Sequence, residues 1–461
     1  MFIRDHTFLL ISLFIFISCE RQSQLSSDND DNEYNFIEED IVLDQNGEVI
    51  TTTIEIDHFS SSEDCQTCHQ QHFEEWGMSM HAHSFHDPIF FNLWSHEKIN
   101  RPSTATNYCT QCHAPASFVS NYDLSEVNSI GDLDFLPDAI KEGVSCQFCH
   151  NTVNTSTDVF TEDNIAAVAE YHLSIDKMVM YGSIQNPEEN AYHDSYYSEI
   201  YESSGICLPC HSQYIRGMPI EATFQEWNSF PGFSMSDEGS CQSCHMKIQP
   251  DGHHDHSFTG VDFHDLTSPL DFSSQEYIKI IDLMESAAEL EFIGQSDSLV
   301  NQIGLNTVLN IPVKIKSFTG HKFPSGTTFS REAWIELKVE DSNQNLIYSS
   351  GIINGVEDLD FSDQNLLVFT SWLLDEEGNI INEASNAYDY IDQTLNTMGT
   401  RFHNYEVFIE NGIEGPLLIS ARLLFRPFKP SILNDLNPEL VPNIPTYEID
   451  SITKEIIISS Q

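Results

Sequence analysis

Basic residues are scarce in this chain of 461 residues, which holds 19 lysines and arginines against 72 aspartates and glutamates. The formal net charge is therefore −53 at pH 7. A negative field of this size argues against nucleic acid and anionic lipid surfaces as partners, because both carry charge of the same sign. It favours basic redox partner proteins, although a surface rich in carboxylates also serves solubility alone.

Long apolar runs are also lacking, so no transmembrane helix is expected. One short apolar run, Phe8 to Ile17, follows Arg4 and predicts a signal peptide over residues 1–19. It ends in Phe16-Ile17-Ser18-Cys19, which resembles a bacterial lipobox with phenylalanine in place of the usual leucine. We therefore expect an exported protein on the periplasmic or cell-surface side, attached to the membrane only by lipid at Cys19. The alternative is ordinary secretion, with Cys19 removed in the signal peptide.

No cysteine other than Cys19 lies outside one repeated pattern, C-x-x-C-H. This pattern attaches c-type haem, since two thiols bond to the porphyrin vinyl groups and the adjacent imidazole is the proximal iron ligand. Zinc, disulfides and thioredoxin-like pairs do not explain a histidine after every pair. The five copies are Cys65–Cys68–His69, Cys109–Cys112–His113, Cys146–Cys149–His150, Cys207–Cys210–His211 and Cys241–Cys244–His245.

Histidines are few outside the stretch that holds these motifs. Of the 20 histidines, 17 lie between His58 and His264. A low-spin haem needs a second axial ligand, and imidazole is the obvious candidate. The clustering therefore predicts that several of the remaining histidines are distal ligands.

The pattern of polar and apolar residues divides the rest of the chain. Residues 20–56 are polar and acidic, which predicts a disordered tether. Residues 57–265 have about 36 residues per haem motif, too few for separate cores, so short helices and loops such as Asn151–Thr157 are expected to wrap the haems. Residues 266–300 predict a helical connector, with an amphipathic helix over 273–292.

Beyond residue 301 the apolar period changes from helical to two. Alternation over 311–315, 333–339 and 417–425 predicts strands, and turn signals follow at Asn354-Gly355, Gly378-Asn379 and Asn411-Gly412. Residues 301–461 are therefore expected to form a β-sandwich-like domain.

Several segments between and after the motifs are distinctive. They are Glu75 to Ala82, Gly143 to Ser145, Tyr192-His193, Asp255 to Phe258, and Thr319 to Gly326 followed by Arg331 to Trp334. With the C-x-x-C-H sites, they resemble the multihaem c-type cytochromes related to cytochrome c-554 and hydroxylamine oxidoreductase. The resemblance covers residues 60 to about 340, and the rest more weakly. It implies an α+β protein, a mainly helical and loop-rich multihaem domain followed by an all-β domain.

The resemblance also suggests distal ligands. His81, His193 and His256 are the first candidates, and His172 and His321 complete the set; His83, His254 and His264 are close rivals. It does not say which distal histidine serves which haem. For His321 there is a plain structural alternative, a hydrogen bond within a Pro-Gly turn.

Two classes of function, and a third behind them, follow from these features. Electron transfer through five c-type haems (iron) comes first, without catalytic residues, because a haem with two histidine ligands has no open position. The alternative is an oxidoreductase that acts on a small nitrogen or sulfur compound at one open haem, and a missing distal ligand would mark it. The third is a structural subunit of an extracellular electron conduit, a homo-oligomer packed through the β-domain.

Overall fold

The computed structural model describes residues 42–157, 168–236, 239–294 and 300–459. The predicted signal peptide, Cys19 and the first part of the predicted tether lie outside these ranges. From Val42 onward the chain forms one compact unit. Within the described ranges, no helix is both long and apolar enough to cross a membrane.

Each C-x-x-C-H motif lies in or beside a single helical turn. Positions i and i+3 of a helix share one face, so both cysteines of a motif point to the same side. Ser145 and Ser240 cap two of these turns by accepting hydrogen bonds from backbone N–H groups. The short helices of this region are α1 (Glu63–Gln66), α2 (Gln70–Gly77), α3 (Met80–His83), α5 (Thr110–His113), α6 (Pro115–Val119), α7 (Asp138–Lys141), α8 (Cys146–Asn151), α9 (Thr223–Asn228), α10 (Pro231–Ser234) and α11 (Cys241–His245).

One longer helix, α4 (Pro88–Asn100), holds the second motif in place. Asp87 caps it by accepting a hydrogen bond from Phe90 N (2.7 Å), and Pro88 fits the first turn, where no N–H partner is needed. Its buried face contributes Phe91 and Trp94 to a core cluster that also contains Phe85.

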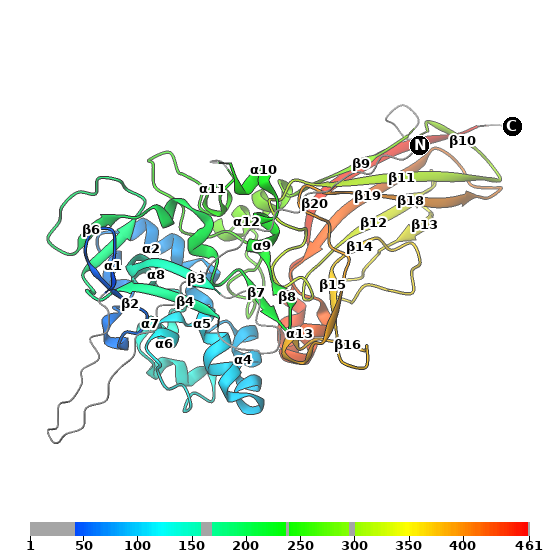
Figure 1. Cartoon of the computed structure of the whole chain (residues 1–461). Helices are drawn as coiled ribbons and strands as arrows, with labels where there is room; N and C mark the ends of the chain where they lie inside the picture. The colour runs from blue at the N-terminus through cyan, green and yellow to red at the C-terminus, as the bar shows by residue number, and fades with distance from the viewer. Residues whose placement is uncertain (1–41, 158–167, 237–238, 295–299, 460–461) are drawn as a thin grey trace, which may run out of the picture. The chain divides into compact units, whose positions relative to one another are not determined.

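A small sheet with the strand order β1-β2-β4-β3 runs through the haem-motif region (Figure 1). Two predictions fail here. The segment 151–157 is not a loop but the end of α8 and strand β3, and residues 42–51 of the predicted disordered tether form a hairpin on β4. Pairing with β4 satisfies their backbone groups, which outweighs the loop preference of Asn and Ser. The strands of this region are β1 (Val42–Leu43), β2 (Val49–Thr51), β3 (Thr152–Thr157), β4 (Ala169–Ser174), β5 (Val179–Gly182), β6 (Asp194–Tyr197), β7 (Gln213–Ile215) and β8 (Met218–Glu221).

The predicted connector helix is shorter than expected. Helix α12 (Gln275–Glu285) begins at Ser274, whose side chain accepts from Tyr277 N (3.1 Å), but it ends before Ala288. Strand β9 (Ala288–Phe292) follows and pairs with β11 (Thr307–Ser317). Ala288 and Leu290 are buried whereas Glu289 is exposed, an alternation of period two that the helical prediction overlooked.

Two sheets packed face to face form the C-terminal part, as the alternating pattern predicted. One has the order β10-β20-β19-β12-β13, with β14 also on β12, and the other has the order β18-β11-β9 (Figure 1). A third sheet, β16-β15-β17, lies apart from both orders. The remaining strands are β10 (Gln302–Gly304), β12 (Glu332–Glu340), β13 (Leu346–Ser350), β14 (Val368–Phe369), β15 (Ser371–Leu374), β16 (Ile380–Ile381), β17 (Asp389–Asp392), β18 (Thr400–Ile409), β19 (Leu417–Arg426) and β20 (Tyr447–Ser459), and helix α13 (Pro430–Leu436) precedes β20.

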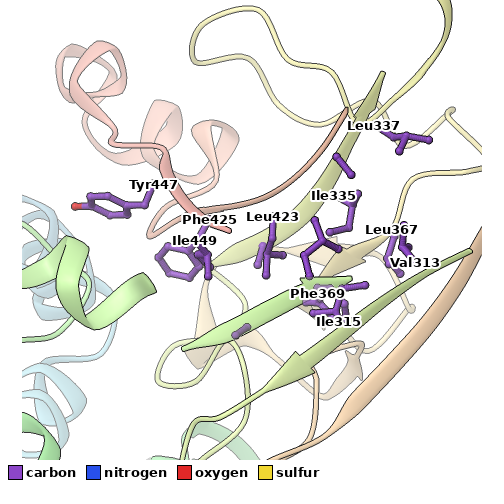
Figure 2. Close-up of a cluster of buried hydrophobic side chains, with 14 of the residues drawn as sticks. Val313, Ile315, Ile335, Leu337, Leu367, Phe369, Leu423, Phe425, Tyr447 and Ile449 are labelled. Carbon is purple, nitrogen blue, oxygen red and sulfur yellow. The ribbon is translucent and has the colours of Figure 1, made fainter. Parts of the chain in front are cut away.

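Side chains from both large sheets fill the space between them. Val313 and Ile315 of β11 lie in one cluster with Ile335 of β12 and Leu423 of β19 (Figure 2). Burial of such side chains stabilises the fold by about 1.5–3 kcal/mol each. The result is the predicted β-sandwich, and its β11–β12 loop reaches the haem motifs.

Candidate haem sites

Four of the five C-x-x-C-H histidines face a second histidine at almost the same distance. The distance between ring centroids is 6.4 Å for His69 and His193, and 6.3 Å for the other three pairs. Those three are His81 with His211, His150 with His256, and His245 with His321. Each pair thus joins one predicted proximal histidine to one candidate distal histidine.

This separation fits a haem iron between the rings. An imidazole nitrogen binds such a metal at about 2 Å and lies about 1.2 Å from the centre of its own ring. Two imidazoles on opposite sides of one iron therefore have centroids about 6.3 Å apart. The four measured separations agree with this value, so the residues present fit six-coordinate haems.

Hydrogen bonds at the other ring nitrogen support this assignment. In five of the histidines, Nδ1 donates to a backbone carbonyl oxygen, which fixes the tautomer and leaves Nε2 for iron. The five bonds are His113 to Ser84 O (2.8 Å), His150 to Tyr181 O (2.7 Å), His245 to Thr259 O (2.7 Å), His256 to His254 O (2.7 Å) and His321 to Lys322 O (2.9 Å).

Burial keeps most of these imidazoles neutral, the form that binds iron. It lowers the pKa of His81 to about 3, and the pKa values of His113, His256 and His321 to about 4. His211 differs. Burial lowers its pKa as well, but the neighbouring Glu221 carboxylate outweighs this and raises the pKa to about 9.

His113 has no such histidine partner. All histidines except His6 are described, and none lies across an iron-sized gap from the His113 ring. Instead, Phe90 of α4 stacks on the His113 ring, with centroids 3.6 Å apart and planes 7° apart. Phe90 and the bond to Ser84 O fix the orientation of this ligand. The second motif therefore has a prepared proximal side and no second imidazole.

The remaining candidates are placed elsewhere. His172, on β4, is not brought to any proximal histidine, and its Nε2 faces Glu170 Oε1 at 3.8 Å. Both ring nitrogens of His83 are bonded, to His86 Nε2 and Gly77 O. His264 bonds to Glu276, which raises its pKa. His254 donates to Met246 O (2.9 Å).

Glu75 links the first motif to the loop that carries His256. Its carboxylate accepts hydrogen bonds from His256 N (2.9 Å), His253 Nε2 (2.9 Å) and Gln71 Nε2 (3.2 Å). Burial raises the pKa of Glu75, but these donors outweigh it and hold the pKa below its ordinary value. The charged side chain thereby anchors the backbone at a candidate distal ligand.

Glu226 of α9 performs a similar task for the β11–β12 loop. It accepts from Lys322 N (3.1 Å) and Ser325 Oγ (2.6 Å), on either side of Phe323 and close to His321. Burial raises the pKa of Glu226 to about 7. The β-sandwich thus supplies one candidate ligand, and a buried carboxyl holds its loop against the haem motifs.

Contacts between cysteines show which motifs are neighbours. The thiols of Cys65 and Cys146 lie within hydrogen-bonding reach, as do those of Cys112 and Cys210, and those of Cys207 and Cys241. The first motif is therefore next to the third, and the fourth is next to both the second and the fifth. No spacing in the sequence indicates this order.

Sequence reasoning missed three residues that bear on these sites, Phe90, Glu221 and Glu226. None stands beside a cysteine motif or in a distinctive pattern. Glu221 and Glu226 are two among 72 acidic residues, and only the folded chain shows that they are buried beside histidines.

Comparison with known families places part of the chain in this class. Residues 64–151, which include three of the motifs, match the family described as cytochrome c554 and c-prime. The chain is thus similar to multihaem c-type cytochromes, as the motifs predicted. No significant match is found among curated proteins.

A solved structure resembles nearly the whole fold. It is a penta-heme cytochrome c552 from Thermochromatium tepidum, at 21% sequence identity and a TM-score of 0.62, and the match covers 87% of this chain and 100% of that chain. At this identity the likeness shows the fold, a haem-motif region followed by a strand-rich region. An alkylpurine DNA glycosylase AlkC from Pseudomonas fluorescens matches 39% of this chain and 33% of its own at 9% identity, and its TM-score of 0.16 carries no argument.

Proposed function

We propose that this protein transfers electrons through five c-type haems, attached by the ten cysteines of its C-x-x-C-H motifs. The observation that carries the proposal is the set of four histidine pairs with ring centroids 6.3–6.4 Å apart. A haem held between two imidazoles has no free coordination position, so its role is to accept and release electrons.

The neighbouring motifs support passage of electrons from haem to haem. Three contacts between cysteines of different motifs bring their haems close together, with the fourth motif next to two others. The solved pentahaem cytochrome that shares this fold is consistent with five haems in one chain.

Haem counting and redox titration test this proposal together. The holoprotein, expressed with a c-type haem maturation system, is expected to contain five haems per chain and to release five electrons over reversible one-electron steps. Fewer than four haems, or irreversible reduction, would overturn it. Replacing Cys109 and Cys112 with alanine gives a matched control, which should lose one haem and one electron.

The second motif favours a second function. His113 has no imidazole opposite it, and Phe90 and Ser84 fix its orientation, so its haem has one position for an exogenous ligand or substrate. The expected result is that the reduced protein binds one equivalent of carbon monoxide, with four haems unchanged. Binding of no carbon monoxide would leave electron transfer as the only function of the five haems.

Export and membrane attachment belong to the same proposal. Cys19, in a lipobox-like sequence, would carry the lipid, and the net charge of −53 would favour basic redox partner proteins. A Cys19→Ala variant of the full chain should move from the detergent phase to the aqueous phase on phase separation. Wild-type protein in the aqueous phase would contradict the lipid anchor.

A further inference from the structure

The fourth motif has a hydrogen-bonding environment that the other motifs lack. Nδ1 of His113, His150 and His245 faces a neutral backbone carbonyl at 2.7–2.8 Å. Nδ1 of His211 instead faces Glu221 Oε1, at 3.5 Å. A proximal histidine opposed by a carboxylate is electronically different from one opposed by a carbonyl, because the carboxylate adds electron density to the imidazole.

The fold holds Glu221 in this position. It is the last residue of β8, in a hairpin with β7, and the same hairpin follows the fourth motif directly. Phe224 N donates to His211 O (2.9 Å), which ties the motif to the start of α9. The carboxylate also accepts from the hydroxyl and the N–H of Thr223. These contacts orient Glu221 without help from the haem.

The charge of Glu221 is shielded from water and has no basic partner. Its side chain is only 18% exposed, and among the residues that the structure describes no lysine or arginine pairs with it. A buried negative charge acts at short range through a medium of low dielectric constant, so its effect on a nearby iron is stronger than that of a surface carboxylate.

On this basis, and given the haem at Cys207 and Cys210 in the proposed function, we propose that Glu221 lowers the reduction potential of that haem. The carboxylate stabilises the ferric state, which carries one more positive charge than the ferrous state, through the Nδ1–H group of the His211 ligand. Glu221 is a positioning residue that acts through His211 and touches no substrate.

The position of this haem makes the effect important for the whole chain. The fourth motif is next to the second through Cys112 and Cys210, and next to the fifth through Cys207 and Cys241. A low potential at this junction keeps electrons on the outer haems, and the junction haem fills last as the protein is reduced. Glu221 therefore sets how electrons divide between the two branches.

The experiment is a redox titration of the Glu221→Gln holoprotein followed by electron paramagnetic resonance. The low-spin signal of this haem is identified first as the one that a His81→Ala variant loses. In Glu221→Gln we expect its reduction equilibrium to shift at least tenfold toward the reduced form, which corresponds to about 59 mV, while the other midpoints stay in place. Glu221→Asp, with a shorter side chain, should fall between glutamine and glutamate.

A Glu170→Gln variant is the matched control, because it removes a carboxylate from a histidine that has no ring partner. An unchanged midpoint in Glu221→Gln, or an equal shift in Glu170→Gln, would overturn the inference. Failure of the proposed function would look different, since the wild-type protein would then lack the haem or its low-spin signal before any substitution.

Discussion

His245 and His321 face each other with ring centroids 6.3 Å apart and planes 21° apart. One belongs to the fifth haem motif and the other to the β11–β12 loop of the sandwich. If both bind the same iron, the β-sandwich is not an independent appendage but completes a haem site. The stability of that loop and the spin state of the fifth haem should therefore depend on each other.

Removal of His321 tests this link directly. His321→Ala should convert one haem of the holoprotein from low-spin to high-spin, because the iron loses its second imidazole. Added imidazole should restore the low-spin spectrum. His172→Ala is the control, since His172 faces Glu170 rather than a proximal histidine, and it should leave all spin states unchanged. A high-spin haem in His172→Ala, with none in His321→Ala, would exchange their roles.

Glu75 should hold His256 in place at the third haem. Glu75→Ala leaves the His256 N–H without its acceptor, at a cost of about 1–3 kcal/mol, and part of the third haem should become high-spin. Glu75→Gln keeps an acceptor oxygen and should retain most of the low-spin signal. The adjacent Glu74, which is exposed and contacts Gln70, offers a control in Glu74→Ala. Equal effects of Glu74→Ala and Glu75→Ala would contradict the anchoring role.

Glu226 should make the stability of the loop depend on pH. Its pKa is raised from 4.5 to about 7 by burial, so the folded protein binds this proton more tightly than the unfolded chain. The contribution to stability is therefore complete below about pH 4.5 and is lost as the pH rises to about 7. We expect a loss of about 1–3 kcal/mol over this window.

Thermal unfolding of Glu226→Gln at several pH values measures this contribution. The glutamine cannot ionise, so the variant should be stabilised relative to wild type above pH 7, with a smaller difference near pH 5. Glu410 is exposed, and Glu410→Gln should leave the dependence on pH as it is in the wild type. An identical dependence in Glu226→Gln and wild type would show that the Glu226 carboxyl does not titrate in this range.

The haem motifs and the strands of the sandwich could be predicted from the sequence because their signals are local. A cysteine pair followed by histidine, and alternation such as that over 311–315, need only a few neighbouring residues. The segment Ala288–Phe292 was harder, since its alternation follows a true helix without a turn signal. Strand β3 was missed because its pairing with β4 arises from tertiary contacts rather than from propensity.

The pairing of histidines could not be predicted for the same reason. His81 is close in sequence to the first motif, yet its ring lies opposite His211 of the fourth. His193, which precedes the fourth motif, lies opposite His69 of the first. Such partners are decided by how the whole chain folds, and no local pattern distinguishes His172, which has no partner, from His321, which has one.

Electron paramagnetic resonance of the fully oxidised holoprotein, with the haems counted, tests the central claim most directly. Four low-spin signals from haems with two histidine ligands, together with one stoichiometric high-spin haem, are the predicted result, because four histidine pairs are present and His113 stands alone. Two or more high-spin haems would contradict the ligand pairs, and five low-spin haems would contradict the open position at His113.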